Sequence, residues 1–174
     1  LKASIDSIVF DTSAKTPAKD EGLPYTLTET ANLKLAERIQ NTILYNKAGK
    51  LTPPQPGKDG APVPPRDPAF IVSQSVSKMK IEDTEDFARR RIKDTPYLKD
   101  LQIEEEKNVE TAGLKGRQLK ATGVDIKSGE KTYLYMQILF QPDGYFIMQG
   151  IAPMSARADS EKDFEAMAAS FKLR

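Results

Sequence analysis

The chain has 174 residues, of which 39% are hydrophobic and 29% charged, and its 26 basic and 25 acidic side chains leave a net charge of +1. It contains no Cys and no His, which excludes disulfides, thiolate metal sites, Cys nucleophiles and Ser-His-Asp triads. The balanced charge gives no field to attract nucleic acid or an anionic membrane, and no stretch approaches the roughly 18 apolar residues of a membrane span.

The first fifty residues carry the weakest pattern. A short strand is expected at 5–10, followed by a loop. From Tyr25 two interpretations compete. Alternating apolar residues indicate a strand, whereas helical spacing with a stop at Gly49 appears in Leu35, Ala36, Ile39, Ile43 and Leu44. We predict a strand near 25–30 running into a helix near 32–46, with two strands as the alternative.

Residues 52–68 hold seven of the chain's 12 prolines. Proline cannot donate a backbone hydrogen bond, and the residue before it avoids the helical region. We therefore predict a loop or insertion of polyproline II character within a single domain that spans 1–174. The run from Pro62 to Arg66 also resembles a ligand of proline-reading modules, although a plain loop is favoured.

The pattern sharpens after this loop. We predict a strand at 70–77 and a helix that begins at Asp83 or Thr84 and stops at Thr95 before Pro96. A strand region at 101–109 is interrupted by three glutamates at 104–106, and Gly113 and Gly116 turn the chain. A strand at 119–124 then ends at a turn at 128–129.

A long hairpin is the strongest element. Residues 132–141 lead to Pro142-Asp143-Gly144, and 145–152 return. In the predicted register Phe140 lies opposite Phe146. Apolar side chains on both faces then place the hairpin at the centre of the sheet, covered on both sides. The same register groups one polar and aromatic cluster, which consists of Tyr133, Tyr135, Gln137, Tyr145 and Gln149.

This cluster is the candidate ligand- or partner-binding site. Buried amides need hydrogen-bond partners, so Gln137 and Gln149 form either a satisfied buried pair or the floor of a shallow cleft. Two charged runs are assigned to solvent. Three arginines at 89–91 point in different directions around a helix, and the glutamates at 104–106 suit an exposed or edge strand.

The last predicted helix starts at Ser160, with Asp163 three residues later as a weak capping box. A core-facing stripe follows at helical spacing, formed by Phe164, Met167, Ala168 and Phe171.

The order strand, helix ending before Pro, two strands, long hairpin and C-terminal helix resembles the PsbP-like α/β/α sandwich superfamily. The most suggestive segment is SEKDFEAMAASFKLR after YFIMQGIAP, and the resemblance covers about 69–174. The group includes the extrinsic P subunit of photosystem II, a nuclear Ran-GTPase-binding relative, and bacterial exported proteins and lipoproteins. The resemblance implies an α+β fold, a three-layer α/β/α sandwich with a central, mainly antiparallel sheet. It implies no chemistry and no functional residues.

We therefore expect a non-catalytic exported accessory or binding protein of bacterial type, periplasmic or a lipoprotein. It would act through a protein partner or a small ligand, with no catalytic residue, cofactor or metal. The chain begins at Leu1 without a Met, which suits either removal of a leader that could carry a lipid anchor or trimming of the chain. The alternatives are an intracellular adaptor similar to the Ran-GTPase-binding relative and, less favoured, a hydrolase that works with carboxylates and lysine.

Overall fold

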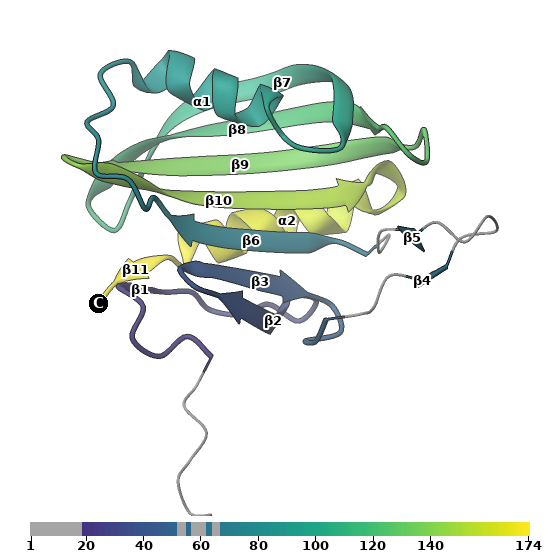
Figure 1. Ribbon diagram of the computed structural model, residues 1–174, viewed down its shortest axis with the longest axis horizontal. Coiled ribbons are helices and arrows are strands. Elements are labelled where there is room, and N and C mark those ends of the chain that lie inside the picture. Colours follow the sequence, from purple (N-terminus) through teal and green to yellow (C-terminus); the bar gives the residue numbers. More distant parts are fainter. Residues whose placement is uncertain (1–18, 52–54, 57–61, 64–66) are drawn as a thin grey trace, which may run out of the picture.

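The computed structural model describes residues 19–51, 55–56, 62–63 and 67–174 (Figure 1). The strand predicted at 5–10 and most of the proline-rich segment lie outside the described residues. Within that segment, β4 (Gln55–Pro56) pairs with β5 (Pro62–Val63) in a two-stranded antiparallel sheet.

The centre of the molecule is a seven-stranded sheet in which every neighbouring pair is antiparallel. In spatial order its strands are β2 (Lys34–Ile39), β3 (Thr42–Asn46), β6 (Ala69–Gln74), β10 (Gly144–Pro153), β9 (Lys131–Gln141), β8 (Leu114–Asp125) and β7 (Leu98–Thr111). The strands β2 and β7 are therefore the two edges.

One helix lies on each face of this sheet (Figure 1). The helix α1 (Thr84–Lys93) packs on β8 and β9, whereas α2 (Arg157–Ala169), preceded by the 3-10 turn η1 (Met154–Ala156), packs on β9 and β10. On the α2 side, a small sheet joins β1 (Tyr25–Thr26) to β11 (Lys172–Leu173). The predicted α+β fold, a three-layer sandwich around an antiparallel sheet, is confirmed.

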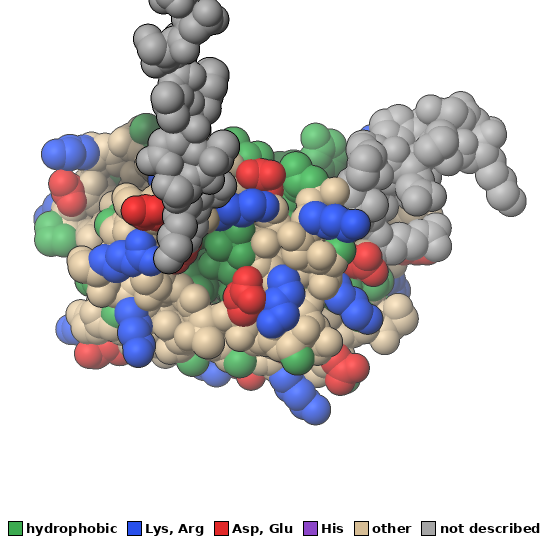
Figure 2. All heavy atoms as spheres, turned by 90° about the horizontal axis from the view of Figure 1, so that it is seen from below, with side chains coloured by type: hydrophobic (Ala, Val, Ile, Leu, Met, Phe, Trp, Pro, Cys, Tyr) green, Lys and Arg blue, Asp and Glu red, His purple; other side chains and the backbone are tan. Residues whose placement is uncertain are grey.

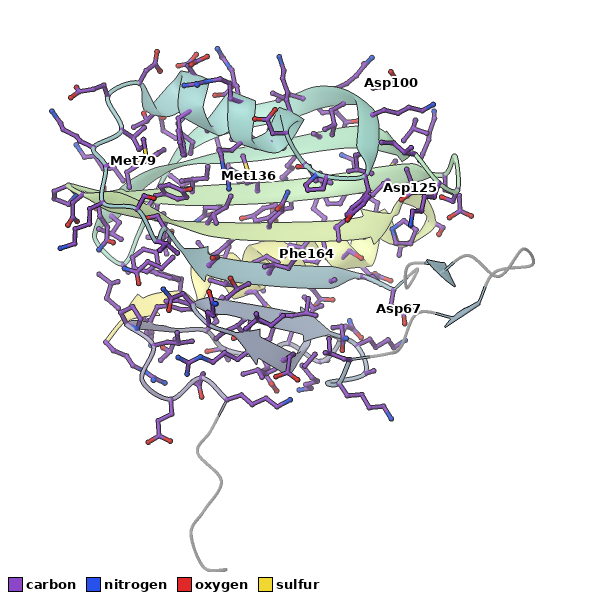
Figure 3. All side chains as sticks on the ribbon, viewed as in Figure 1. Asp67, Met79, Asp100, Asp125, Met136 and Phe164 are labelled. Atoms are coloured by element: carbon purple, nitrogen blue, oxygen red, sulfur yellow. The ribbon has the colours of Figure 1, made fainter. Side chains whose placement is uncertain are left out.

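Two hydrophobic cores fill the spaces between the layers. Phe164 of α2 packs with Tyr133 and Tyr135, whereas Ile92 of α1 packs with Leu134 and other residues of β8 and β9. Figure 3 labels one residue of each core, Phe164 and Met136. The predicted central position of the hairpin is confirmed, and so is its double covering for β9, which is buried on both faces from 132 to 139. On β10 alternate residues are only half-buried, so one face of that strand is incompletely covered.

The predicted register of this hairpin is wrong by one residue. Gly144 pairs with Gln141, so Pro142 and Asp143 alone form the tip, and Phe146 lies opposite Leu139 rather than Phe140. Side chains alternate between the two faces of a strand, so a slip of one residue changes which residues share a face. The predicted Gln137–Gln149 pair is therefore absent, because Gln137 lies opposite Met148.

The helix predicted near 32–46 is also wrong, and the alternative of two strands is what the structure has. The chain turns between β2 and β3 at Gln40, whose φ of 54° is left-handed. Along β3, buried Ile43 and Tyr45 alternate with half-buried neighbours, which is the period of a strand. The helical spacing joined residues from the two sides of this turn.

Smaller corrections concern element boundaries. The strand β7 continues through the glutamates at 104–106, with register shifts near 99–102 and 103–105. Gly116 lies inside β8 rather than in a turn, where a Cβ atom would collide with the carbonyl oxygen of Ile138. The helix α2 begins three residues before Ser160, and β6 ends at Gln74. The cap of α1 is as predicted, because Asp83 accepts a hydrogen bond from the Asp86 amide.

Candidate functional site

The two helices leave two diagonally opposite parts of the sheet without a helix (Figure 1). The first, on the α1 face over the β2 side, is here named the open face and consists of Glu37, Ile39, Thr42, Leu44, Ala69, Ile71, Ser73, Ile147, Gln149 and Ile151. The second, on the α2 face over the β7 side, is named the ion-paired surface and consists of Glu104, Glu105, Lys107, Gln118, Lys120 and Thr122.

Cross-strand neighbours make the open face continuous over four strands. Ile71 lies opposite Leu44 on one side and Gln149 on the other, and Ser73 lies between Thr42 and Ile147 in the same way. Along β3, β6 and β10 the alternate residues are buried in the α2-side core, whereas these residues are half-buried or exposed. Ile71 is 37% exposed and Ile39, at the β2 edge, is 63% exposed.

Polar side chains on the open face are hydrogen-bonded within the protein. The hydroxyl oxygens of Thr42 and Ser73 lie 3.0 Å apart. The Gln149 Nε2 donates to Thr95 Oγ1 over 2.9 Å, and the Thr95 hydroxyl donates in turn to the Ile92 carbonyl over 2.7 Å. Each of these side chains therefore already has a hydrogen-bond partner inside the protein, which lowers the cost of covering it.

The flank of α1 and the loop before it border the open face. The Phe87 ring packs against Tyr145 of β10, with ring centroids 5.0 Å apart. In the loop, Val76 and Met79 are exposed, and the Met79 amide donates to the Asp143 carbonyl over 3.2 Å; Figure 3 labels Met79. Figure 2, which looks onto the β2 side, shows acidic and basic side chains around hydrophobic ones.

The ion-paired surface is built around a buried lysine. The side chain of Lys120 is 8% exposed, and its Nζ lies 2.6 Å from Glu161, 2.8 Å from Glu165 and 3.3 Å from Glu105. Burial alone would lower the pKa of this ammonium group, but the hydrogen bonds and charges of Glu161 and Glu165 outweigh it and raise the pKa well above its ordinary value. Lys120 is therefore a permanent cation that ties α2 to β8 and β7.

Neighbouring polar groups on the α2 face are also engaged. Arg157 contacts Glu104 at 2.7 Å and stacks over the Tyr133 ring at 4.7 Å. The Tyr135 hydroxyl lies 3.0 Å from Gln137 Oε1 and 3.2 Å from Gln118 Oε1, so its single proton is shared between two acceptors. Burial raises the pKa of both tyrosines, so neither ionises near neutrality.

A second ionic network holds α1 to the sheet. Arg89 pairs with Glu85 and with Glu106, and Glu106 also contacts Arg117. Burial would raise the pKa of Glu106, but its hydrogen bonds to Arg117 and Arg89 hold the pKa below its ordinary value. The predicted solvated face is confirmed for Arg90, which pairs with Asp86 one turn earlier. The same prediction is incomplete for Arg89, because its side chain also forms an ion pair with Glu106 of β7.

The structure separates the five residues of the predicted binding cluster. Tyr133, Tyr135 and Gln137 are fully or almost fully buried on the α2 face. Tyr145 and Gln149 lie on the other face, where both are half-buried at the margin of the open face. Binding by these residues stays a prediction, but one cleft cannot contain all five.

Sequence reasoning missed Lys120 and the open face. The signal for Lys120 was its position between Leu119 and Ala121, which are buried on the α1 face, so Lys120 had to point toward α2. The signal for the open face was the strand alternation in β3, which the helical interpretation hid.

The described residues offer little for catalysis or metal binding. They contain no group of three or more Asp or Glu side chains placed to hold a metal ion. A groove of about 580 Å³ beside the start of α1 is lined by Thr84, Lys115, Arg117, Phe140 and residues of β7, but its arginine is already held by Glu85 and Glu106. No helix within the described ranges is long and apolar enough to cross a membrane.

No protein-family model and no curated protein sequence match this chain. Solved structures do match it. The yeast Saccharomyces cerevisiae Ran-binding protein Mog1p has a TM-score of 0.57 at 9% identity, covering 86% of this chain and 90% of that one. LpqN of Mycobacterium tuberculosis, which is involved in cell envelope biogenesis, has a TM-score of 0.56 at 13% identity, covering 86% and 82%.

The cyanobacterial PsbP protein of Synechocystis has a TM-score of 0.50 at 10% identity, covering 93% of this chain and 99% of that one. Identities this low show the fold alone. The resemblance to the PsbP-like α/β/α sandwich is therefore confirmed for the fold, now over both halves of the chain rather than only 69–174.

Proposed function

We propose that this protein is a non-catalytic binding or accessory protein that holds a protein partner on the open face. The observation that carries the proposal is a row of aliphatic side chains on adjacent strands beside α1, formed by Leu44, Ile71, Ile147 and Ile151. Ile147 and Ile151 are half-buried against the α1-side core, whereas Ile71 is 37% exposed.

The row of aliphatic side chains differs from the rest of the sheet, where apolar residues are buried under a helix or charged residues face solvent. Where α1 covers the same face, equivalent residues such as Ile138 are fully buried. Where the opposite face lacks a helix, charged side chains occupy the surface and pair with one another. Burying apolar surface is favourable by roughly 25 cal/mol per Å², and a contiguous apolar patch on a soluble protein marks an interaction surface.

The Ran-binding Mog1p supports a binding role, and Mog1p and LpqN favour different compartments. The relation of LpqN to the cell envelope supports an exported bacterial protein, which is the placement we propose. The Ran-binding Mog1p supports the second candidate, an intracellular adaptor. Fractionating the source cells decides between them, because recovery in the cytosolic fraction would exclude export.

A photo-crosslinking residue placed at position 71 tests the proposed function in the source cells. The matched control carries the same residue at position 126, because Ile126 is an exposed isoleucine in the turn between β8 and β9, away from the open face. We expect a discrete crosslinked product from position 71, lost when Ile147→Lys is added, and no equivalent product from position 126. Equal products at both positions, or none at position 71, would contradict the proposal.

A further inference from the structure

We propose that the element that docks on the open face is an amphipathic α-helix of the partner, lying beside α1 with an acidic flank toward Arg91. This inference rests on the proposed function and specifies the occupant of the same site.

The width of the open face fits one helix. Strands lie about 4.8 Å apart, so β10, β6 and β3 span about 10 Å, close to the 10–12 Å diameter of a helix with its side chains. On the same face, α1 already covers β9, the neighbour of β10, and β8 beyond it. The six residues of β6 are about 20 Å long, which is the length of a helix of about 13 residues.

Binding of a partner β-strand to the edge of the sheet is a less suitable mode on this side than docking of a helix. The strands β3, β6 and β10 already have two neighbours each, so only β2 presents an edge. Two backbone groups of β2 are engaged by side chains: the Leu35 amide donates to Glu29 over 2.7 Å, and the Ala36 carbonyl accepts from Lys19. Contact through side chains on the face, as both resident helices make, is therefore the better mode.

Charge on the α1 flank specifies the partner further. Arg91 lies four residues after Phe87, whose ring packs on Tyr145 of β10, so it projects from the flank that overlooks the open face. Arg89 and Arg90 are paired with carboxylates, but no described residue forms an ion pair with Arg91. At the opposite border, Lys34 is paired with Glu29. A partner helix with a carboxylate toward Arg91 would complement this cation.

Titration of the 15N-labelled full chain with designed peptides tests this inference. One N-acetylated peptide of about 18 residues carries Leu and Ile at i, i+3, i+4 and i+7 with Glu along one flank, and its match carries Lys there. We expect the Glu peptide to shift the amides of Leu44, Ile71 and Ile147, to gain helicity by circular dichroism, and to bind about 2- to 5-fold more tightly than the Lys peptide.

The variant Arg91→Glu should reverse this preference, whereas Arg90→Glu, a matched charge change on a paired arginine, should leave it unchanged. Equal binding of the two peptides, shifts confined to other surfaces, no shifts at all, or tighter binding of an extended peptide with alternating apolar residues would each overturn the helix proposal. The crosslinking at position 71 is independent of these peptides. If position 71 gives the crosslinked product but the peptide titration fails, the proposed function is supported and the helical partner is excluded.

Discussion

The open face and the ion-paired surface are two parts of one sheet that no helix covers fully, and they differ in the chemistry of their side chains. On the ion-paired surface Lys120 forms ion pairs with three glutamates, so its charged side chains are paired within the protein. On the open face Thr42, Ser73 and Gln149 each make a hydrogen bond within the protein, but the aliphatic side chains beside them are left half-buried or exposed. Lack of a covering helix thus does not identify a binding site; the chemistry of the uncovered residues does.

The ion-paired surface also has a structural task. It adjoins β7, an edge strand of 14 residues whose charges and register shifts oppose pairing with another chain. Its lysine further anchors α2, since two of its three carboxylates belong to that helix. Substitutions on this surface should therefore change stability, whereas substitutions on the open face should change binding.

The largest effect is expected for Lys120→Met. This variant removes the cation that Glu105 of β7 and two glutamates of α2 share. It should lower the free energy of unfolding by about 2–4 kcal/mol. Urea denaturation measures the change. Lys107→Met is the control, because Lys107 is half exposed and, among the described residues, forms an ion pair only with Glu105. This variant should lower the free energy of unfolding by about 0–1 kcal/mol. Equal losses would show that the Lys120 network is not structural.

Acidification gives the next largest effect. The pKa values of Glu106 and Glu161 are held below the ordinary 4.5, so both groups contribute stability above that pH and lose it as the pH falls through their lower folded values. The raised pKa of Lys120 has the opposite sign: its contribution is complete below 10.5 and is lost as the pH rises beyond that value. Stability should be flat from pH 4.5 to about 10, where the buried tyrosines begin to ionise in the unfolded chain, and it should fall below pH 4.5. Lys120→Met should make the fall at acid pH smaller. An unchanged acid profile in that variant would contradict this assignment.

Ile71→Ser should change stability by about 1 kcal/mol or less, because its side chain is already partly in water, whereas Ile147→Ser should cost more because Ile147 is half-buried against the α1-side core. They should, however, reduce binding of a hydrophobic fluorescent dye, whereas Ile126→Ser should not reduce it. A stability loss of several kcal/mol in Ile71→Ser would mean that the open face is part of the core rather than a surface.

The smallest effect is expected where two partners are removed together. Thr42→Val combined with Ser73→Ala eliminates both ends of one hydrogen bond and leaves no unpaired group, so unfolding should change by less than about 0.5 kcal/mol. A larger loss in thermal or urea denaturation would show that this pair holds β3 to β6.

The sequence was sufficient for elements that depend on local chemistry. Asp83 caps α1, Pro96 follows its end, and the stripe from Phe164 to Phe171 packs into a core, all as predicted. The resemblance to PsbP-like proteins supplied the layer order. These features are encoded within a few residues or one helix face, which is why periodicity and capping rules find them.

What could not be predicted depends on pairing between distant residues. The turn of the hairpin has two residues instead of the predicted three, which shifts the strand register by one residue. Gln137 and Gln149 therefore do not lie opposite each other. The apolar row of the open face joins Leu44, Ile71 and Ile147, which come from three separate strands and meet only when strand order is known. The cation at Lys120 likewise meets carboxylates from β7 and from α2.

The most direct test of the central claim compares capture of the partner by three chains in the source cells. Reversible crosslinking with tagged wild type, Ile71→Lys and Ile126→Lys places the same new charge on and off the open face. We predict that Ile71→Lys loses most of the captured complex while all three chains unfold at the same urea concentration. Equal capture by the two variants would contradict the claim that the open face is where this protein binds.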